Sequence, residues 1–476
     1  MHPLILVHRW LGVVFCLFFA MWFATGIVMH FIAFPALSEA ERVAGLAPID
    51  PAGLRHGPAD AVSASGIEAA TRVRLHTRAD GLVYRVDGAA GVRAIFAANM
   101  SPAGVRSESI AVAIAADHAR RRELNATAAT FAELASHDQW TVSNGLDPHR
   151  PLYRIKLNDE PGTELYVSSA TGEVVRDTTR RERGWNYAGS VAHWIYPTAL
   201  RRDQRTWDVT VWTLSLVALI TAVAGALSGT LRIQSARGRL VSPHHGWLAW
   251  HHWLGLVCMT FVISWIFSGW LSMDHGRLFS TGKPAPTEAV NFARATAWEK
   301  LSPREISLLP AQALEIEWFA FDGRIYRRER FGLTSQRLAF AGDASAPGRA
   351  FLQPDEASAA ASRLAPDCLP AATVRVIDDY PVVSVMPDAP VYRSVCSQVW
   401  FHLDGANGAM LEKLDPSRRA YRWAYSALHT LDFPALSGRP LLRTVLIVTL
   451  CGFGLVFSLT TIVIGWRRLR GLLPVH

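Results

Sequence analysis

The stretch VHRWLGVVFCLFFAMWFATG at 7–26 is apolar enough for a membrane span, yet it carries a histidine, His8, at its second position. A second stretch, WHHWLGLVCMTFVISWIFSG at 250–269, repeats this plan 243 positions later and places His251 on His8. A transmembrane helix needs about 20 apolar residues, so both stretches are expected to cross a bilayer. The match predicts that the chain consists of two copies of one plan.

Four windows of the chain are long and apolar enough to be transmembrane helices. They cover residues 10–34, 207–231, 248–273 and 441–466. The first window is too long for the apolar part of a cleaved signal peptide. The predicted order is span 1 (1–34), outer domain 1 (35–206, with a pre-span segment 185–200), span 2 (207–231), inner loop (232–247), span 3 (248–273), outer domain 2 (274–440, with a pre-span segment 421–436), span 4 (441–466) and inner tail (467–476).

Basic residues indicate the orientation of these spans. The short loop between spans 2 and 3 carries Arg232, Arg237 and Arg239, and the tail WRRLRGLLPVH is also basic. Short basic loops stay in the cytoplasm, whereas long domains cross the membrane largely regardless of their charge. Both termini are therefore predicted to be cytoplasmic and both large domains periplasmic. The net charge of +8 needs no nucleic-acid partner, because the lipid bilayer and its interfaces account for it.

The outer domains repeat as well. ADGLVYRV at 79–86 matches FDGRIYRR at 321–328, and LYVSSATGEVV at 165–175 matches FHLDGANGAML at 401–411. Each of these pieces reads as strands joined by a tight turn. The predicted fold class is therefore a membrane four-helix bundle with pseudo-two-fold internal duplication, plus two α+β domains outside the membrane.

A third match lies just before spans 2 and 4. WNYAGSVAHWIYPTAL at 185–200 matches YRWAYSALHTLDFPAL at 421–436, which aligns His193 with His429 at an offset of 236. The repeat thus selects two histidine pairs, one at each end of the predicted bundle. Ionisable residues in membrane helices are costly and usually functional.

Two imidazoles that face each other across a helix bundle are the axial ligands that a b-type haem needs. The pairs His8 with His251 and His193 with His429 therefore predict two haems, one near each membrane face. Gly12 and Gly255 follow the first pair by one turn and would let a flat ring approach the backbone. The chain has no C-x-x-C-H motif, so covalent haem attachment is excluded.

Three other histidines compete for these roles. His252 is adjacent to His251, and only one of the two can ligate the same haem because neighbouring side chains point about 100° apart on a helix. His30 and His275 lie near the outer ends of spans 1 and 3 but do not align with each other. They are secondary candidates for outer ligands or substrate contacts. An interfacial, purely structural role stays open for every one of these histidines.

Cysteines and other motifs add little chemistry. Cys368 and Cys396 are the only cysteines in the polar segments, and an oxidising periplasm would allow them to pair. The chain lacks H-E-x-x-H, G-x-S-x-G and a P-loop. No catalytic group beyond a haem relay is therefore predicted.

The chain resembles the PepSY-associated transmembrane proteins and, within them, the inner-membrane ferric-siderophore reductases. The resemblance covers nearly the whole length. It rests on HRWLG, HHWLG, AHWIYPTALRR, ALHTLDFPAL, ATGIVMHF, FSGWLSM and the hairpins around SATGEV and GANGAM. It implies periplasmic PepSY domains, haem b held by His8, His193, His251 and His429, and reduction of a ferric siderophore. His30 and His275 depart from the family pattern.

The resulting hypothesis is a haem-dependent reductase that passes electrons across the bacterial inner membrane to a periplasmic ferric siderophore and releases Fe(II) for uptake. Its electron donor is unknown, with membrane quinol as one option. One alternative is a haem-free PepSY regulator that binds a periplasmic partner. Another is a b-type electron carrier with a different acceptor.

Overall fold

The computed structural model describes residues 2–471 except 89–90, 237–238, 277, 285–287, 289–291, 293–297, 302 and 344–347. Arg237 of the predicted basic loop and residues 472–476 of the predicted tail lie outside this description. The chain forms two compact units. We call them the helical unit (up to Phe34, Glu182–Phe279 and from Arg419 onward) and the sheet unit (Pro35–Arg181 and Ser280–Arg418).

Four long helices make up most of the helical unit. They are α1 (His2–Phe31), α7 (Gln204–Thr230), α8 (Trp247–Ser272) and α14 (Pro440–Leu469). Each is long and apolar enough to cross a membrane, as the sequence predicted. The first helix begins earlier and ends earlier than the predicted window 10–34. Its polar start at His8 still forms regular helix, and Pro35 disfavours helical backbone just before it.

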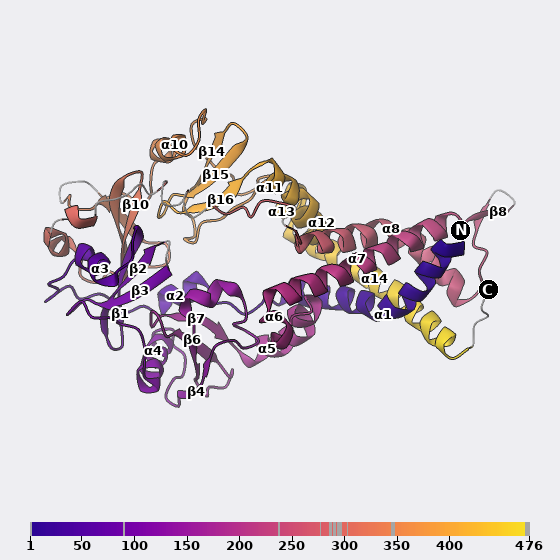
Figure 1. Cartoon of the computed structure of the whole chain (residues 1–476), viewed down its shortest axis with the longest axis horizontal. Helices are drawn as coiled ribbons and strands as arrows, with labels where there is room; N and C mark the ends of the chain where they lie inside the picture. The colour runs from indigo at the N-terminus through magenta and orange to yellow at the C-terminus, as the bar shows by residue number, and fades with distance from the viewer. Residues whose placement is uncertain are drawn as a thin grey trace. The chain divides into compact units, whose positions relative to one another are not determined.

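The four helices share one apolar core. α1 and α8 each pack along both α7 and α14, so the two helices with matched sequences lie across from each other. Phe15, Phe23, Cys258, Val262 and Cys451 are buried between them. A short hairpin, β8 (Gln234–Ala236) and β9 (Arg239–Val241), joins α7 to α8 at the end of this unit that also carries both termini (Figure 1). We call this the terminal end.

The two predicted pre-span segments belong to the helical unit and have the same local form. The first comprises α5 (Arg180–Asn186), the π-helical turn Tyr187–Val191 and α6 (Thr198–Arg201). The second comprises α11 (Pro416–Tyr421), the π-helical turn Arg422–Ala427, α12 (Leu428–Thr430) and α13 (Pro434–Ser437). In both, the π-helical turn ends two residues before the matched histidine. Such turns are rare and occur frequently at functional sites.

A six-stranded antiparallel sheet forms the centre of the sheet unit, in the order β12-β11-β10-β1-β2-β3. Its strands are β1 (Ala70–Arg78), β2 (Gly81–Gly88), β3 (Gly91–Phe96), β10 (Glu315–Phe321), β11 (Arg324–Arg330) and β12 (Gln336–Phe340). β1 pairs with β10, so both outer segments contribute to one sheet. These segments were predicted from the sequence as two separate outer domains, because pairing between strands far apart in the chain leaves no local pattern.

Two four-stranded antiparallel sheets complete the unit. The first contains β4 (Thr130–Ala135), β5 (Leu152–Lys156), β6 (Glu164–Ser168) and β7 (Val174–Thr178), and the second contains β13 (Ala372–Thr373), β14 (Val391–Cys396), β15 (Val399–Asp404) and β16 (Met410–Leu414). Their helices are α4 (Glu108–Arg121) and α10 (Pro354–Ser362). Gly172 and Gly408 take positive φ angles in the predicted tight turns. A disulfide joins Cys368 to Cys396.

Short helices and single turns fill the connections. They are α2 (Glu39–Ala44), α3 (Pro58–Ser65) and the 3-10 turns Asn144–His149, Trp298–Lys300 and Pro303–Leu308.

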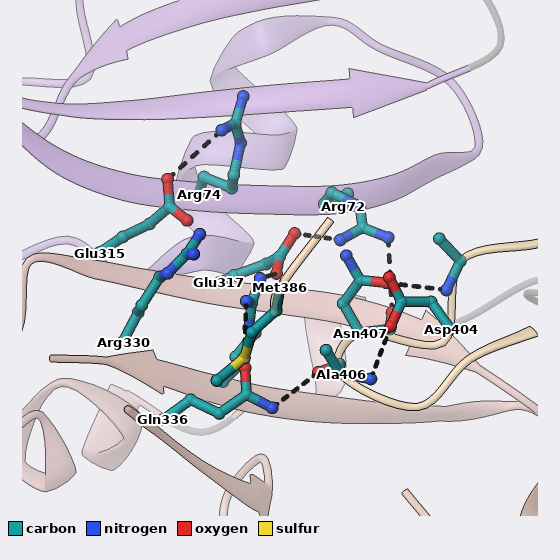
Figure 2. Close-up of polar contacts among 12 residues, drawn as sticks. Arg72, Arg74, Glu315, Glu317, Arg330, Gln336, Met386, Asp404, Ala406 and Asn407 are labelled. Atoms are coloured by element: carbon teal, nitrogen blue, oxygen red, sulfur yellow. Dashed lines mark hydrogen bonds and ion pairs between the residues drawn. The ribbon is translucent and has the colours of Figure 1, made fainter. Parts of the chain in front are cut away.

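The central sheet buries an apolar face and a charged face. The apolar face carries Val73, Leu75 and Trp318. On the other face Arg74 pairs with Glu315 and Arg72 pairs with Glu317 (Figure 2). Arg328 also pairs with Glu317. Burial alone would raise the pKa of the Glu317 carboxyl, but its two arginine partners lower that pKa to about 2. Buried charges are tolerated because they are paired.

Candidate functional site

The first predicted histidine pair meets inside the helical unit. His8 on α1 and His251 on α8 place their ring centroids 6.1 Å apart. The Nδ1 atom of His8 is 3.0 Å from the backbone oxygen of Thr221 on α7. The Nδ1 atom of His251 is 3.2 Å from Oγ1 of Thr460 on α14. All four long helices therefore contribute to this pair, two through the rings and two through their hydrogen-bond partners.

The second predicted pair also meets. His193 and His429, from the two segments with π-helical turns, have ring centroids 6.3 Å apart. His193 Nδ1 is 2.9 Å from Thr25 Oγ1, and His429 Nδ1 is 3.1 Å from Ser268 Oγ. Thr25 and Ser268 are themselves 243 positions apart, the offset that relates His8 to His251. The two halves thus hold their second histidine in the same way.

Two matched tryptophans fix the position of the second pair. Trp22 Nε1 donates to the backbone oxygen of His193 at 3.0 Å, and Trp265 Nε1 donates to that of Leu428, also at 3.0 Å. Trp22 and Trp265 again share the offset of 243. Each pre-span segment is therefore anchored to α1 or α8 by a tryptophan–backbone hydrogen bond as well as by its histidine.

The hydrogen bonds assign the same tautomer to all four rings. A backbone carbonyl such as that of Thr221 only accepts, so His8 Nδ1 carries the proton. The hydroxyls of Thr25, Ser268 and Thr460 donate to main-chain oxygens of their own helices. They therefore accept from the imidazoles, whose Nδ1 atoms must be protonated.

The four Nε2 atoms then carry lone pairs. Within the part of the chain that the structure describes, none of these Nε2 atoms has a hydrogen-bond partner. An Nδ1–H held by a protein oxygen with a free Nε2 is the arrangement of metal-ligating histidines. A metal–imidazole bond is about 2 Å long, so rings that ligate one atom from opposite sides have centroids about 6 Å apart. Both measured separations, 6.1 and 6.3 Å, match this value.

A cavity of about 410 Å³ adjoins the first pair, between the four helices. His8, His251 and both predicted glycines, Gly12 and Gly255, line it. A Cβ atom on Gly12 would meet nothing within 4 Å, whereas one on Gly255 would lie 3.3 Å from the Phe457 ring. Gly12 thus borders open space, while Gly255 makes room for an aromatic side chain.

A glycine that the sequence did not single out is needed for the first pair. A Cβ atom on Gly225 of α7 would lie 2.5 Å from Cε1 of His8. Gly269 has a milder version of this role beside the second pair, where a Cβ would lie 3.2 Å from Cε1 of His429. These glycines allow the imidazoles to pack directly on neighbouring helix backbone.

The adjacent histidine His252 points elsewhere. Its Nδ1 is 2.8 Å from Ser242 Oγ and its Nε2 is 2.9 Å from the backbone oxygen of Gly229. Both ring nitrogens are therefore used in holding the loop after β9 and the end of α7. This side chain stabilises the local fold, and the geometry favours His251 over it as the partner of His8.

The two secondary candidates lie in neither pair. His30 Nε2 is 2.9 Å from Thr444 Oγ1, near the start of α14. His275 Nδ1 is 2.8 Å from a carboxylate oxygen of Asp208, and its ring packs on Trp212. Each has a local partner, so the structure brings together the four repeated histidines and leaves these two apart.

The sequence missed the hydrogen-bond partners of the rings. Thr25 and Ser268 were detectable, since they share the offset of 243 and directly precede Gly26 and Gly269. Thr221 acts through its backbone oxygen, which leaves no signal in the residue type. Such contacts require the helix packing to be known.

The fold and the paired histidines define the class first: a membrane protein with four apolar helices and a large antiparallel α+β unit. The profile of the family described as "PepSY-associated TM region" matches residues 5–468. The chain therefore belongs to this family, as the sequence motifs had predicted. No curated protein and no solved structure matches the chain.

Proposed function

We propose that the chain is a haem b-containing reductase of the bacterial inner membrane that delivers electrons to a periplasmic ferric siderophore. The observation that carries the proposal is the geometry of the two pairs: four Nδ1-protonated imidazoles, facing each other at 6.1 and 6.3 Å. His8 with His251 and His193 with His429 would each hold one haem. Bound haem supplies one-electron oxidation and reduction at its iron.

The chain's own residues prepare both sites. The oxygens of Thr221, Thr25 and Ser268 fix the tautomers and the ring directions. The apolar core of the helices excludes water from the space between the pairs. Thr25, which contacts the second pair, is 17 residues from His8 along α1, about 26 Å at 1.5 Å per residue. The two sites would therefore lie near opposite faces of a bilayer whose hydrocarbon core is about 30 Å thick.

The same proposal includes an internal duplication of the helix bundle and an orientation of the chain in the membrane. The offsets of 243 and 236 recur in the helices, the rings, their hydrogen-bond partners and the sheet, which supports a pseudo-two-fold bundle. The basic terminal end is placed in the cytoplasm, and the sheet unit in the periplasm, following the charges of the short loop and tail. The disulfide between Cys368 and Cys396 agrees with an oxidising compartment for the sheet unit.

The acceptor is inferred from the family resemblance. A siderophore holds Fe(III) through hard oxygen ligands, which hold the softer Fe(II) far less well. One electron therefore frees the metal without breaking the chelator. The chemistry of the histidine pairs does not specify the electron donor on the cytoplasmic side. Membrane quinol is one option.

Absorption spectroscopy of the purified chain tests the haem, and stopped-flow mixing tests the acceptor. We expect a Soret band that shifts on addition of dithionite. The reduced protein should then be reoxidised by a ferric siderophore, and a ferrous chelator should report released Fe(II). A colourless protein would instead support a haem-free regulator. A haem protein that ferric siderophores do not reoxidise would be an electron carrier with another acceptor.

A further inference from the structure

The cavity beside His8 and His251 has an apolar body and a cationic end. Three arginines line it, Arg9, Arg232 and Arg468, while none of its described lining residues is Asp or Glu. Arg9 follows His8 on α1, Arg232 stands just after α7, and Arg468 lies in the last turn of α14. Three arginines that line one cavity, with no acidic neighbour among the described lining residues, favour an anionic ligand at this end.

Two of these arginines are related by the repeat. Arg232 and Arg468 are 236 positions apart, the same offset that relates His193 to His429. Arg9 has no such counterpart, because its matched position holds His252. Cations are favoured near helix C-termini, so the positions alone would be unremarkable. Here, however, both side chains line the same cavity, which calls for a further role.

The lining of the cavity suits a molecule with an apolar body and one charged edge. Phe19, Val262 and Ile263 line its other part. Phe19 is ten residues beyond Arg9 on α1, so the cavity extends about 15 Å along the helix. One end is therefore basic and the other is bounded by apolar side chains.

We propose that Arg232 and Arg468 bind the two propionate carboxylates of the haem held by His8 and His251, one arginine for each carboxylate. This inference rests on the proposed function. Haem b carries both carboxylates on one edge of an apolar ring. A two-fold axis that lies in the ring plane and passes between the two carboxylates exchanges them. The same rotation also exchanges the two faces of the ring. The same kind of rotation relates His8 to His251 and Arg232 to Arg468.

This assignment fixes the orientation of the ligand. The carboxylate edge faces the terminal end of the helical unit, where both termini and β8 lie (Figure 1). The apolar edge faces Phe19 and Val262. A guanidinium group matches a carboxylate with two parallel hydrogen bonds, which makes arginine better suited than lysine to this task.

Haem binding to the purified full chain tests the assignment. Haem-depleted protein is titrated with haem b and with its dimethyl ester, in which both carboxylates are neutral. The variants are Arg232→Gln, Arg468→Gln and the double variant. Arg467→Gln is the matched control, because Arg467 is the exposed neighbour on α14 and does not line the cavity.

We expect the wild type and the control to prefer haem b over the ester at the site of His8 and His251. Each arginine variant should lose about tenfold to a hundredfold in affinity for haem b, the range for a hydrogen bond to a charged group. Its affinity for the ester should not change. The midpoint potential of this haem should become more negative in the variants' haem b complex, because a cation that disfavours the oxidised iron is gone.

The outcomes separate this inference from the function on which it rests. A wild type that binds no haem contradicts the proposed function itself. A wild type that binds haem but does not discriminate the ester, or a double variant that behaves like Arg467→Gln, overturns only the carboxylate assignment. If a glutamine variant loses haem from both histidine pairs, the variants Arg232→Lys and Arg468→Lys distinguish a lost carboxylate contact from general misfolding. Recovery of binding with the charge restored supports the assignment, and no recovery overturns it.

Discussion

Arg74 and Glu317 stand directly opposite each other in the central pairing of β1 with β10, and they are also 243 positions apart in the sequence. The same offset relates His8 to His251 in the helical unit. The strand register thus places matched positions of the two segments around a local two-fold axis. Residues next to this axis form buried ion pairs, among them Arg72 with Glu317 and Arg74 with Glu315 (Figure 2).

Removing one member of these buried ion pairs should destabilise the sheet unit strongly. Glu317→Ala leaves Arg72 and Arg328 buried without their shared carboxylate. Breaking a buried ion pair on one side costs about 3–5 kcal/mol. Thermal unfolding followed by near-ultraviolet circular dichroism should show a lower midpoint for this unit. Asp117→Ala, which breaks the more exposed ion pair between Asp117 and Arg121, should cost less than about 1 kcal/mol. Equal effects of the two substitutions would contradict the account.

Acid should destabilise the sheet unit through two buried histidines. Burial lowers the pKa of His76 to about 4 and that of His118 to about 4, with smaller effects from nearby arginines and carboxylates. In the unfolded chain both titrate near pH 6.5, so stability is complete above that pH and declines as pH falls towards 4. Each histidine contributes up to about 3 kcal/mol to this loss.

A substitution isolates this effect from the titration of carboxylates. His76→Phe introduces the residue type found at the matched position, Phe319. In denaturant unfolding between pH 6.5 and 4, the variant should lose the part of the pH dependence that His76 contributes, up to about 3 kcal/mol. An unchanged slope would show that His76 is protonated in the folded protein.

Substitution of Gly225 should disturb the first histidine pair. In Gly225→Ala the new Cβ would lie 2.5 Å from the His8 ring, so the ring must move away from its partner. We expect loss of the haem at this pair and retention of the other. Gly452→Ala on α14 is the control, because its Cβ meets nothing within 4 Å. The haem content per chain, measured as the pyridine haemochrome, should fall to about one in Gly225→Ala and stay at the wild-type value in Gly452→Ala.

The hydroxyl partners of His193 and His429 should affect the affinity and the midpoint potential of the haem at this pair. Thr25→Val and Ser268→Ala remove the acceptors of the imidazole Nδ1–H groups. Such partners raise ligand basicity, and losing one typically weakens metal binding by about 10- to 100-fold. The midpoint potential should rise, because a less basic ligand stabilises the ferric state less. Thr210→Val, which removes an exposed hydroxyl on α7, should change neither quantity.

Local patterns in the sequence predicted much of this structure. The four helices follow from hydropathy, the hairpins at Gly172 and Gly408 from turn chemistry, and the two histidine pairs from the recurring offsets. The shared six-stranded sheet was missed, because β1 and β10 are far apart in the chain and nothing local specifies their pairing. The interactions that set each imidazole tautomer were missed for the same reason.

Some signals were present and not used. The alternation in β1 places Arg72 and Arg74 on one face and Val73 and Leu75 on the other, which indicates a charged buried layer. Neither His76 nor His118 was singled out from the sequence, yet both are buried. The pair Arg232 and Arg468 shares the offset of 236, so the repeat alone pointed to it.

The stoichiometry of haem b in the purified chain shows whether each histidine pair holds one haem. We predict two haems per chain, one in His8→Ala, one in His429→Ala and none in the double variant. His252→Ala, which alters the neighbour of His251, should keep both. A chain without haem, or one whose haem content is unchanged by the loss of both His8 and His429, would contradict the account.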